Sequence, residues 1–400
     1  MELLAPAGDM QKLKMALSFG ADAVYFAGKK FGLRTFAGNF DESQLAEAIE
    51  YVHSKGKKAY ITVNVMPRDS DMREIVDYCK HLHDIKADAV IIADLGVFCA
   101  VRREVPDLEV HISTQANVVN SETANAYYNM GAKRIVLARE LTLDQIKEIR
   151  ANTPKDLELE AFVHGAMCIS YSGRCLLSNF FTNRDANAGA CVQACRWCYE
   201  LREVSRENTN PIEEDSHGTY ILNSYDICMI EYLDKLAQAG ITSLKIEGRM
   251  KTEYYVANVV NAYRHALDLY NQNPQNYVCP PELRAELDKS SHRGYSTGFY
   301  LDGKSKVDLV SNVQTSTHIF VGVVLEDSVD GRAKVQMRNR FYISDELEVL
   351  SPYSLGKSLK MTKIVNDKGD EIDDVKVVMQ EVYIYTDTPL HKNDILRKKL

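Results

Sequence analysis

Cysteine is the residue type whose spacing in this sequence most clearly predicts chemistry. The chain has nine cysteines, and five of them fall between positions 168 and 198. Thiolates are soft ligands that suit zinc or iron–sulfur clusters, and four of them complete a site. An odd number of cysteines in a 400-residue chain argues against a framework of disulfides. The sequence therefore predicts a metal centre in this stretch, with an iron–sulfur cluster favoured and structural zinc as the alternative.

Two subsets of the cysteines could supply the ligands. Cys191, Cys195 and Cys198 have the C-x3-C-x2-C spacing by which radical SAM enzymes hold three irons of a [4Fe–4S] cluster, and Trp197 precedes the last cysteine. Radical SAM enzymes place this motif after the first strand of their barrel. Here it follows the seventh predicted strand, so the context disfavours that interpretation.

The second subset joins Cys168, Cys175 and one of the later cysteines with Cys228. A short turn containing Gly173 separates the first two and can bring their thiolates to one point. We expect Cys228 at the start of a helix over 226–240, where the helix N-terminus would favour a thiolate.

The elements that must position these residues alternate between short β-branched runs and amphipathic helical stretches. Such alternation predicts parallel strands joined by crossover helices, and eight strands favour a closed (β/α)8 TIM-type barrel. The predicted strands cover residues 2–5, 23–27, 59–65, 89–93, 109–113, 134–138, 157–163 and 243–247, with helices over 41–55, 71–85, 121–130 and 142–150.

The pattern divides the chain into three parts. Residues 1–275 form the predicted barrel, interrupted after its seventh strand by a Cys-rich insertion over 165–218. Residues 276–316 are turn-rich and predict a connecting arm. Alternating runs separated by Asp, Gly and Asn then predict a small all-β barrel domain over 317–400.

Polar residues follow the predicted barrel strands at their carboxyl ends, where the active sites of such barrels lie. Several arginines around one mouth indicate an anionic substrate, because guanidinium binds carboxylate or phosphate in a bidentate way. We predict His164 and Glu247 as catalytic, although His164 could also be an ordinary buried histidine. Ser113 and Thr114 lie at the same mouth. The predicted substrate-binding residues are Arg34, Asn64, Gln115, Asn117, Arg139, Arg184 and Arg249.

The overall composition narrows the class of protein. A net charge of −8 argues against a protein that coats nucleic acid non-specifically, but it is compatible with a local basic surface that binds RNA. The sequence has no run of eighteen apolar residues and begins without a signal-peptide pattern, so we expect a cytoplasmic protein that does not enter membranes. A peptidase would need an activated nucleophile; Cys168 with His164 could form a Cys–His pair, but no orienting third residue is evident.

The stretch EAFVHGAMCISYSGRCLLS, Glu160 to Ser178, closely resembles the signature of peptidase family U32. The resemblance extends over nearly the whole chain through LLAPAG, GADAVYFAG, HISTQAN, ARELTLDQI, KIEGRMKTEYYV and RGYSTGF. It implies the barrel fold and two kinds of activity, collagenase-like peptidase or hydroxylation protein. The single-chain architecture most resembles the branch that hydroxylates the wobble uridine of tRNA at C5 with prephenate as co-substrate.

The resemblance also implies a ligand set and partners. Family members of oxygen-independent ubiquinone synthesis carry a [4Fe–4S] cluster on four cysteines, and their spacing matches Cys168, Cys175, Cys191 and Cys228. Cys195 remains the alternative third ligand. Expected partners are tRNA, prephenate and a possible second family subunit; a non-catalytic iron–sulfur partner protein is a further alternative.

Overall fold

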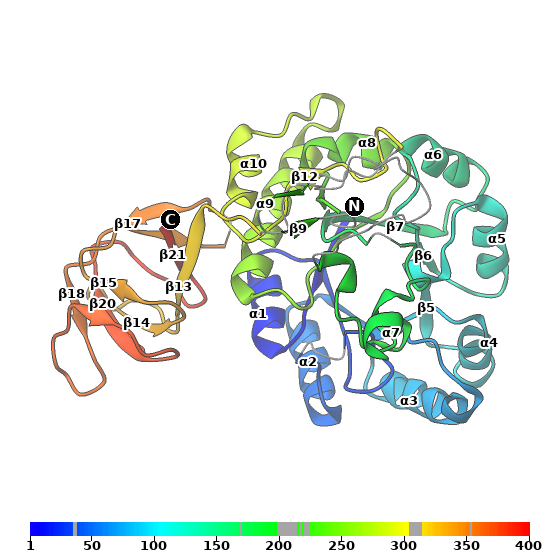
Figure 1. Cartoon of the computed structure of the whole chain (residues 1–400), viewed down its shortest axis with the longest axis horizontal. Helices are drawn as coiled ribbons and strands as arrows, with labels where there is room; N and C mark the ends of the chain where they lie inside the picture. Colours follow the sequence, from blue (N-terminus) through cyan, green and yellow to red (C-terminus); the bar gives the residue numbers. More distant parts are fainter. Residues whose placement is uncertain are drawn as a thin grey trace.

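The chain folds into a large barrel with a smaller β domain beside it (Figure 1). The computed structural model describes all residues except 35–37, 169, 198–213, 216–217, 220–223, 304–313 and 353. Each part has its own apolar core, the larger one between the barrel strands and the surrounding helices.

Eight parallel strands close the barrel, which confirms the predicted fold class. Each strand pairs with the next, and the last pairs with both the seventh and the first. Its strands are β1 (Glu2–Pro6), β2 (Ala23–Phe26), β3 (Lys58–Val63), β4 (Ala89–Ile92), β5 (Glu109–Ile112), β6 (Arg134–Val136), β7 (Glu158–Gly165) and β11 (Ser243–Ile246).

The helices outside the barrel begin where short polar side chains cap them. The side chains of Asp9, Asp41, Asp94, Asn120, Thr142 and Thr252 each accept a hydrogen bond from a backbone N–H three residues later. The helices are α1 (Met10–Ser18), α2 (Glu42–Ser54), α3 (Met72–Asp84), α4 (Leu95–Glu104), α5 (Ser121–Asn129), α6 (Leu143–Ala151), α8 (Leu233–Gln238) and α9 (Glu253–Gln272). Among the described residues, no helix combines the length and the apolar character needed to cross a membrane.

A network of buried charges fills the amino-terminal end of the barrel. Arg134 Nη1 lies 2.6 Å from Glu2 Oε1 and 2.9 Å from Glu160 Oε2, and Lys245 Nζ lies 2.6 Å from Glu160 Oε1. Burial alone would raise the pKa of Glu160, but Lys245 and Arg134 lower it to about 2. The carboxylate therefore stays ionised and holds both cations inside the barrel.

The helix predicted over 226–240 is wrong in its first half. Residues Asp226–Cys228 form β10, which pairs antiparallel with the end of β7, and α8 begins only at Leu233. A two-residue strand, β12 (Tyr295–Ser296), pairs with the outer edge of β10. The chain returning from the insertion satisfies its backbone groups by extending the sheet, so helix formation is delayed.

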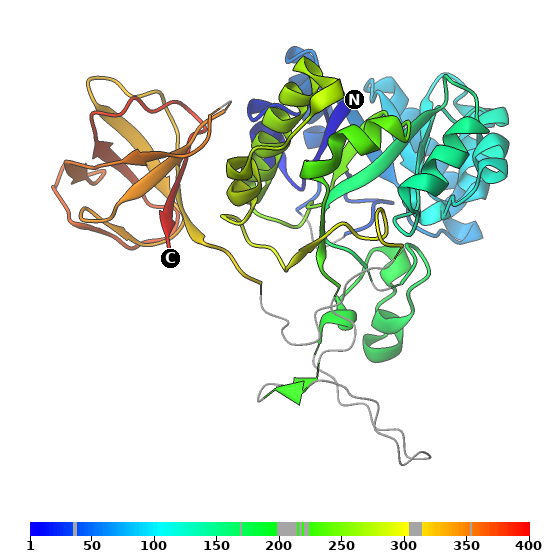
Figure 2. The same ribbon diagram turned by 90° about the horizontal axis from the view of Figure 1, so that it is seen from above.

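The Cys-rich insertion leaves the carboxyl end of β7, as predicted, and the structure places it over the barrel mouth (Figures 1 and 2). Its described part contains α7 (Leu177–Thr182) and two short turns, Ala186–Ala188 and Ala194–Arg196. Hydrogen bonds fasten it to barrel loops; for example, Met66 N donates to Asn187 O at 3.2 Å, and Asn117 Nδ2 donates to Ser172 O at 2.9 Å.

The arm contains α10 (Pro281–Leu287), and the C-terminal domain is all-β as predicted. Its main sheet has the order β17-β16-β21-β13-β14-β20-β18, and no pairing of described residues joins the two edge strands, so it forms a half-barrel rather than a closed barrel. The buried Arg397 ties it to the larger domain by contacts with Glu286 at 2.5 Å and Asn258 at 3.0 Å. The strands are β13 (His318–Val324), β14 (Arg332–Met337), β16 (Leu347–Leu350), β17 (Lys357–Leu359), β18 (Lys363–Val365), β20 (Glu381–Tyr385) and β21 (Ile395–Lys399), with the separate pair β15 (Phe341–Tyr342) and β19 (Asp374–Val375).

Candidate functional site

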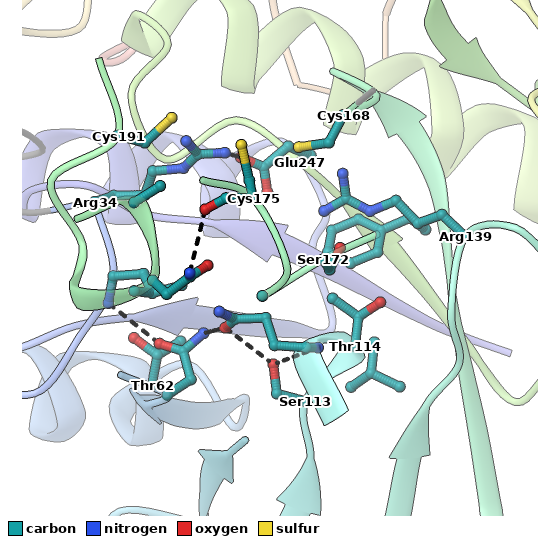
Figure 3. A pocket seen from close by; sticks show the side chains of 18 of the residues that line it. Arg34, Thr62, Ser113, Thr114, Arg139, Cys168, Ser172, Cys175, Cys191 and Glu247 are labelled. Atoms are coloured by element: carbon teal, nitrogen blue, oxygen red, sulfur yellow. Dashed lines mark hydrogen bonds and ion pairs between the residues drawn. The ribbon is translucent and has the colours of Figure 1, made fainter. Parts of the chain in front are cut away.

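A cavity lies at the carboxyl ends of the barrel strands, between the strand ends and the insertion (Figure 3). The barrel supplies its floor and walls, and the insertion supplies its roof. Of the residues that the sequence predicted, the cavity brings together Arg34, Asn64, Ser113, Thr114, Gln115, Arg139, Glu247, Arg249, Cys168, Cys175 and Cys191.

Four predicted site residues do not line this cavity: His164, Cys228, Asn117 and Arg184. Asn117 instead holds the roof, because its amide donates to Gln115 O and Ser172 O. Arg184 is exposed on the loop after α7.

A β-bulge explains why His164 faces away from the cavity. Along β7, Phe162 pairs with Lys245, but His164 pairs with Ile246, so one extra residue is accommodated between them. A bulge shifts the alternation of side chains, and His164 therefore faces outward although Phe162 lines the cavity. Cys228 lies directly opposite His164 across the antiparallel pair and is likewise absent from the cavity lining.

His164 is enclosed by aromatic rings. The ring centroids of Tyr295, Tyr263 and Tyr255 lie 5.3, 5.4 and 6.0 Å from its own, and neither ring nitrogen has a hydrogen-bond partner among the described residues. Burial, with a smaller effect from His292 and other nearby cations, holds the pKa of His164 well below its usual range. The imidazole is neutral at physiological pH and cannot reach a group bound in the cavity.

Cys228 shares this buried environment. Burial raises the pKa of its thiol to about 11, in spite of hydrogen bonds from the Ile230 backbone and the Tyr263 hydroxyl. The expected helix N-terminus at Cys228 is wrong, because Cys228 lies in a strand, and in the absence of a bound metal its surroundings favour the neutral thiol.

Three arginines reach the cavity from different loops, and they differ in their partners. Arg34 pairs with Glu247 at 3.5 Å. Arg139 Nη1 donates to Ala166 O at 3.0 Å, and its guanidinium lies 4.0 Å from the centroid of the Phe162 ring. Neither Arg139 nor Arg249 forms an ion pair with any carboxylate in the described part of the chain, so the cavity has an excess of positive charge.

Arg249 is held by neutral oxygens instead of carboxylates. Its guanidinium donates to Thr62 Oγ1 at 3.0 Å, to Asn39 Oδ1 at 3.2 Å and to Leu33 O. Burial lowers the pKa of Arg249 to about 10, which still leaves the side chain charged at neutral pH. The barrel thus keeps this cation in place where an anion could approach it.

Glu247 is the central acidic group of the cavity. Burial alone would raise its pKa, but Arg34, Arg139, Arg249 and Lys245 together lower it below the usual value, so it is ionised. Its carboxylate accepts a hydrogen bond from Tyr25 Oη at 3.3 Å. In this state Glu247 is a hydrogen-bond acceptor and a possible proton acceptor, not a proton donor.

Amide side chains line the opposite wall. Asn64 Nδ2 donates to Gln115 Oε1 at 2.7 Å, and Asn64 Oδ1 accepts from Leu33 N at 3.2 Å. These bonds join the loops after β2, β3 and β5 into one wall. Donor and acceptor amides of this kind can recognise a planar polar ring such as a nucleobase.

The thiols of Cys168, Cys175 and Cys191 form the upper rim of the cavity (Figure 3). Cys195 also lines the cavity. Cys191 Sγ accepts from Gln193 N at 3.4 Å and from Ser178 Oγ of α7 at 3.8 Å, and these bonds orient the thiol. Within the described residues, no three His, Cys, Asp or Glu side chains are grouped so as to hold one metal ion. Cys198 lies outside the described residues, so the radical SAM-like trio stays a prediction.

Sequence reasoning missed the polar and aromatic side chains of the floor: Tyr25, Thr62, Phe162 and Lys245. A signal for two of them was present. Lys245 precedes Glu247 by two positions, and Thr62 precedes Asn64 by two, so strand alternation predicts a shared face for each pair. Tyr25 and Phe162 gave no such signal, because aromatic residues in strands are usually core residues.

Comparison with known proteins gives matches over almost the whole chain. The family described as Peptidase family U32 matches residues 8–309, and its C-terminal domain family matches residues 316–397. A "tRNA hydroxylation protein P1" of Bacillus subtilis is 38% identical, over 99% of this chain and 94% of the relative. A "tRNA hydroxylation protein P" of Escherichia coli is 35% identical over 92% and 90%, and an "Uncharacterized protease MJ0090" of Methanocaldococcus jannaschii is 42% identical over 75% and 72%.

Proposed function

The chain belongs to peptidase family U32, and we propose that it is an RNA-modifying enzyme that hydroxylates tRNA. The relatives from Bacillus subtilis and Escherichia coli that are named for tRNA hydroxylation match over both domains, whereas the relative named as a protease matches over three quarters of the chain. The specific reaction we propose is formation of 5-hydroxyuridine at the wobble position, with prephenate as co-substrate. The proposed reaction takes place in the cytoplasm.

The observation that carries this proposal is that one cavity contains both cysteine thiols and arginines that lack a carboxylate partner among the described residues. Arg139 and Arg249 have no carboxylate partner among the described residues, and both line the cavity below the thiols. Prephenate is a dicarboxylate, so two such guanidinium groups match its two charges. The amide wall of Asn64 and Gln115 is then available to the base.

The donor set at the rim fits an iron–sulfur cluster. Cys168, Cys175, Cys191 and Cys195 line the same cavity, and thiolates are the ligands that such clusters take. Each ligand of a four-iron cluster binds a different iron, so the thiols stand further apart than the ligands of one ion.

We propose that Cys168, Cys175 and Cys191 bind three irons, and that Cys195 binds the fourth. The spacing that the family resemblance implies would instead use Cys228, whose side chain lies in the separate tyrosine-lined environment. When bound, the cluster supplies one-electron transfer beside the substrate. The chain's own residues hold the dicarboxylate, orient the base and keep Glu247 ionised as a hydrogen-bond or proton acceptor.

Two observations oppose the peptidase alternative. A Cys–His pair would need His164 at Cys168, but His164 is buried among tyrosines and has no hydrogen bond at either nitrogen. The chain also contains one Gly-x-Ser-x-Gly sequence, at 294–298. Its Ser296 is buried in β12, and both nitrogens of the nearby His292 are occupied, by Arg293 O and Asp288.

The test compares tRNA nucleosides by mass spectrometry from cells with the gene, without it, and with the gene carrying Cys175→Ala. We expect 5-hydroxyuridine derivatives only with the intact gene, and we expect a brown, iron-containing protein from anaerobic purification. Unchanged nucleosides together with gelatin cleavage by the pure protein would reverse the assignment. Mixing this chain with a second family member and measuring the mass of the complex tests whether another subunit is needed.

A further inference from the structure

Three aromatic side chains of the insertion are exposed beside the cavity, and we refer to them as the aromatic ladder. Phe180 and Phe181, at the end of α7, are 79% and 45% exposed, and Trp197 is 41% exposed. The rings form a series, with centroids 5.1 Å apart between Phe180 and Phe181 and 6.0 Å apart between Phe181 and Trp197. Trp197 is the single tryptophan of the chain.

The ladder is poorly explained by folding. Helix α7 buries Ser178 and turns its two phenylalanines to solvent, which reverses the usual arrangement of an amphipathic helix. The neighbouring Leu176 is 72% exposed, so the apolar surface is larger than the rings alone. Contiguous exposed apolar surface of this kind marks a site of interaction.

The ladder is continuous with the cavity. Trp197 follows Cys195, which lines the cavity, by two residues. Tyr171 both lines the cavity and is half exposed at its mouth. A ligand lying on the ladder would therefore lie next to the opening through which a substrate enters.

Arginines accompany the aromatic ladder in the sequence. Residues 165–197 contain three arginines, Arg174, Arg184 and Arg196, and one acidic residue, Asp185, and the remainder of the insertion, 198–218, adds two arginines and six acidic residues. Arg174 is exposed and forms no ion pair with the described residues. Exposed aromatic rings among arginines are the surface that binds single-stranded nucleic acid, because bases stack on the rings and arginines neutralise phosphates.

We propose that the aromatic ladder stacks the unpaired bases next to the target nucleotide, so that an RNA loop is held while its target base passes Tyr171 into the cavity. The inference rests on the proposed function and specifies how that site selects a single-stranded loop. It predicts preference for an unpaired loop over a duplex, since a paired base cannot offer its face to a side chain.

The experiment uses the full chain, purified anaerobically, and an RNA hairpin with an unpaired loop. Binding is measured by fluorescence anisotropy of labelled RNA, and the emission of Trp197 reports stacking without interference from another tryptophan. The control RNA is the same stem closed as a continuous duplex. We expect the hairpin to quench Trp197 emission at saturation and the duplex to leave it unchanged.

Substitutions separate stacking from general apolar contact. We expect Trp197→Ala and Phe180→Ala each to raise the Kd for the hairpin about tenfold, and Trp197→Phe and Phe180→Tyr to leave it nearly unchanged. Leu269→Ala is the matched control, because Leu269 is 38% exposed on α9, outside the insertion.

If the hairpin binds without changing Trp197 emission, and the alanine variants bind it with unchanged affinity, the inference that the ladder stacks bases is overturned. The proposed function would not be affected by that result. A wild-type protein that binds no RNA would remove the proposed function itself. A Trp197→Ala variant that changes from dimer to monomer, with RNA affinity intact, would assign the surface to self-association and also overturn the inference.

Discussion

Arg139 offers the sharpest test of how the cavity binds its proposed dicarboxylate. It is a buried cation with one hydrogen bond, to Ala166 O, and one ring contact, to Phe162. Its Nε has no hydrogen-bond partner in the described part of the chain. We therefore expect Arg139→Ala to weaken binding of the dicarboxylate while leaving the fold nearly as stable as in the wild type.

The magnitude follows from the interactions that the substitution removes. A hydrogen bond to a charged group contributes about 1.5–3 kcal/mol, so loss of one carboxylate contact should raise the KM for prephenate about 10- to 150-fold. In folding, the variant loses about 1 kcal/mol from the bond to Ala166 and about 1–2 kcal/mol from the stack on Phe162. Removal of a buried, unpaired charge offsets these losses.

Arg249→Ala is the matched control, because Arg249 is equally buried but well bonded. Its removal leaves Thr62, Asn39 and Leu33 oxygens without their donor, at about 1–3 kcal/mol for each buried unsatisfied group. We expect this variant to lose both prephenate affinity and stability. Arg139→Lys should fall between wild type and Arg139→Ala in KM, because it keeps the charge but not the planar fork.

The assay measures KM for prephenate from the hydroxylated nucleoside, together with Tm with and without prephenate. Ligand at a hundred times its Kd stabilises the wild type by about 2.7 kcal/mol, and a tenfold weaker variant by only about 1.4 kcal/mol at the same concentration. An Arg139→Ala protein with unchanged KM and an unchanged prephenate-induced rise in Tm would refute the reasoning. A loss of Tm as large as that of Arg249→Ala would assign Arg139 to the fold instead.

Three further predictions follow from the buried groups and the thiols. Glu160→Gln should destabilise the barrel by about 3–5 kcal/mol in urea unfolding, because Lys245 stays buried without its partner; since the folded pKa of Glu160 is lowered to about 2, its stabilising effect is complete above pH 4.5 and is lost as the pH falls toward 2. The Cys195→Ser protein should lose iron, whereas the Cys228→Ser protein should retain it, as measured by iron content and absorbance. The opposite result would make Cys228 the fourth ligand, as the family resemblance implies, and would require its side chain to turn out of its buried environment. His164→Phe should keep hydroxylation and raise the urea midpoint more at pH 5.5 than at pH 7.5, because below about pH 6.5 the unfolded wild type gains a proton that buried His164 does not take up; equal midpoints at both values would contradict this.

The barrel could be predicted because its strands are short β-branched runs that are buried on both faces. All eight predicted strands overlap the observed ones, and the convergence of Asn64, Arg139 and Arg249 follows from their positions just after strands. Parallel strands bring their carboxyl ends to one edge whatever the loops do. That part of the site needs no knowledge of side-chain packing.

The errors concern residues whose direction depends on a local irregularity. A bulge in β7 turns His164 outward, and the pairing of β10 with β7 places Cys228 opposite it. No residue pattern marks that bulge, because its position is decided by how β11 fits against β7. The sequence placed Arg34 at the cavity correctly. Its ion pair with Glu247 was not predicted, because the alternation of side chains along strands says nothing about the course of the loop that carries Arg34.

The roof and the amide wall of the cavity are coupled through one loop. Gly173 has a φ of +74°, and a Cβ at this position would lie 3.1 Å from Gln115 O, so the insertion approaches the loop after β5 as closely as its backbone permits. Asn117, in a left-handed conformation on that loop, donates to Ser172 O in the turn between Cys168 and Cys175. The same loop carries Gln115, which belongs to the amide wall. A displacement of the two cysteines would therefore move the wall proposed to face the base, so binding of the cluster and binding of the base are expected to depend on each other.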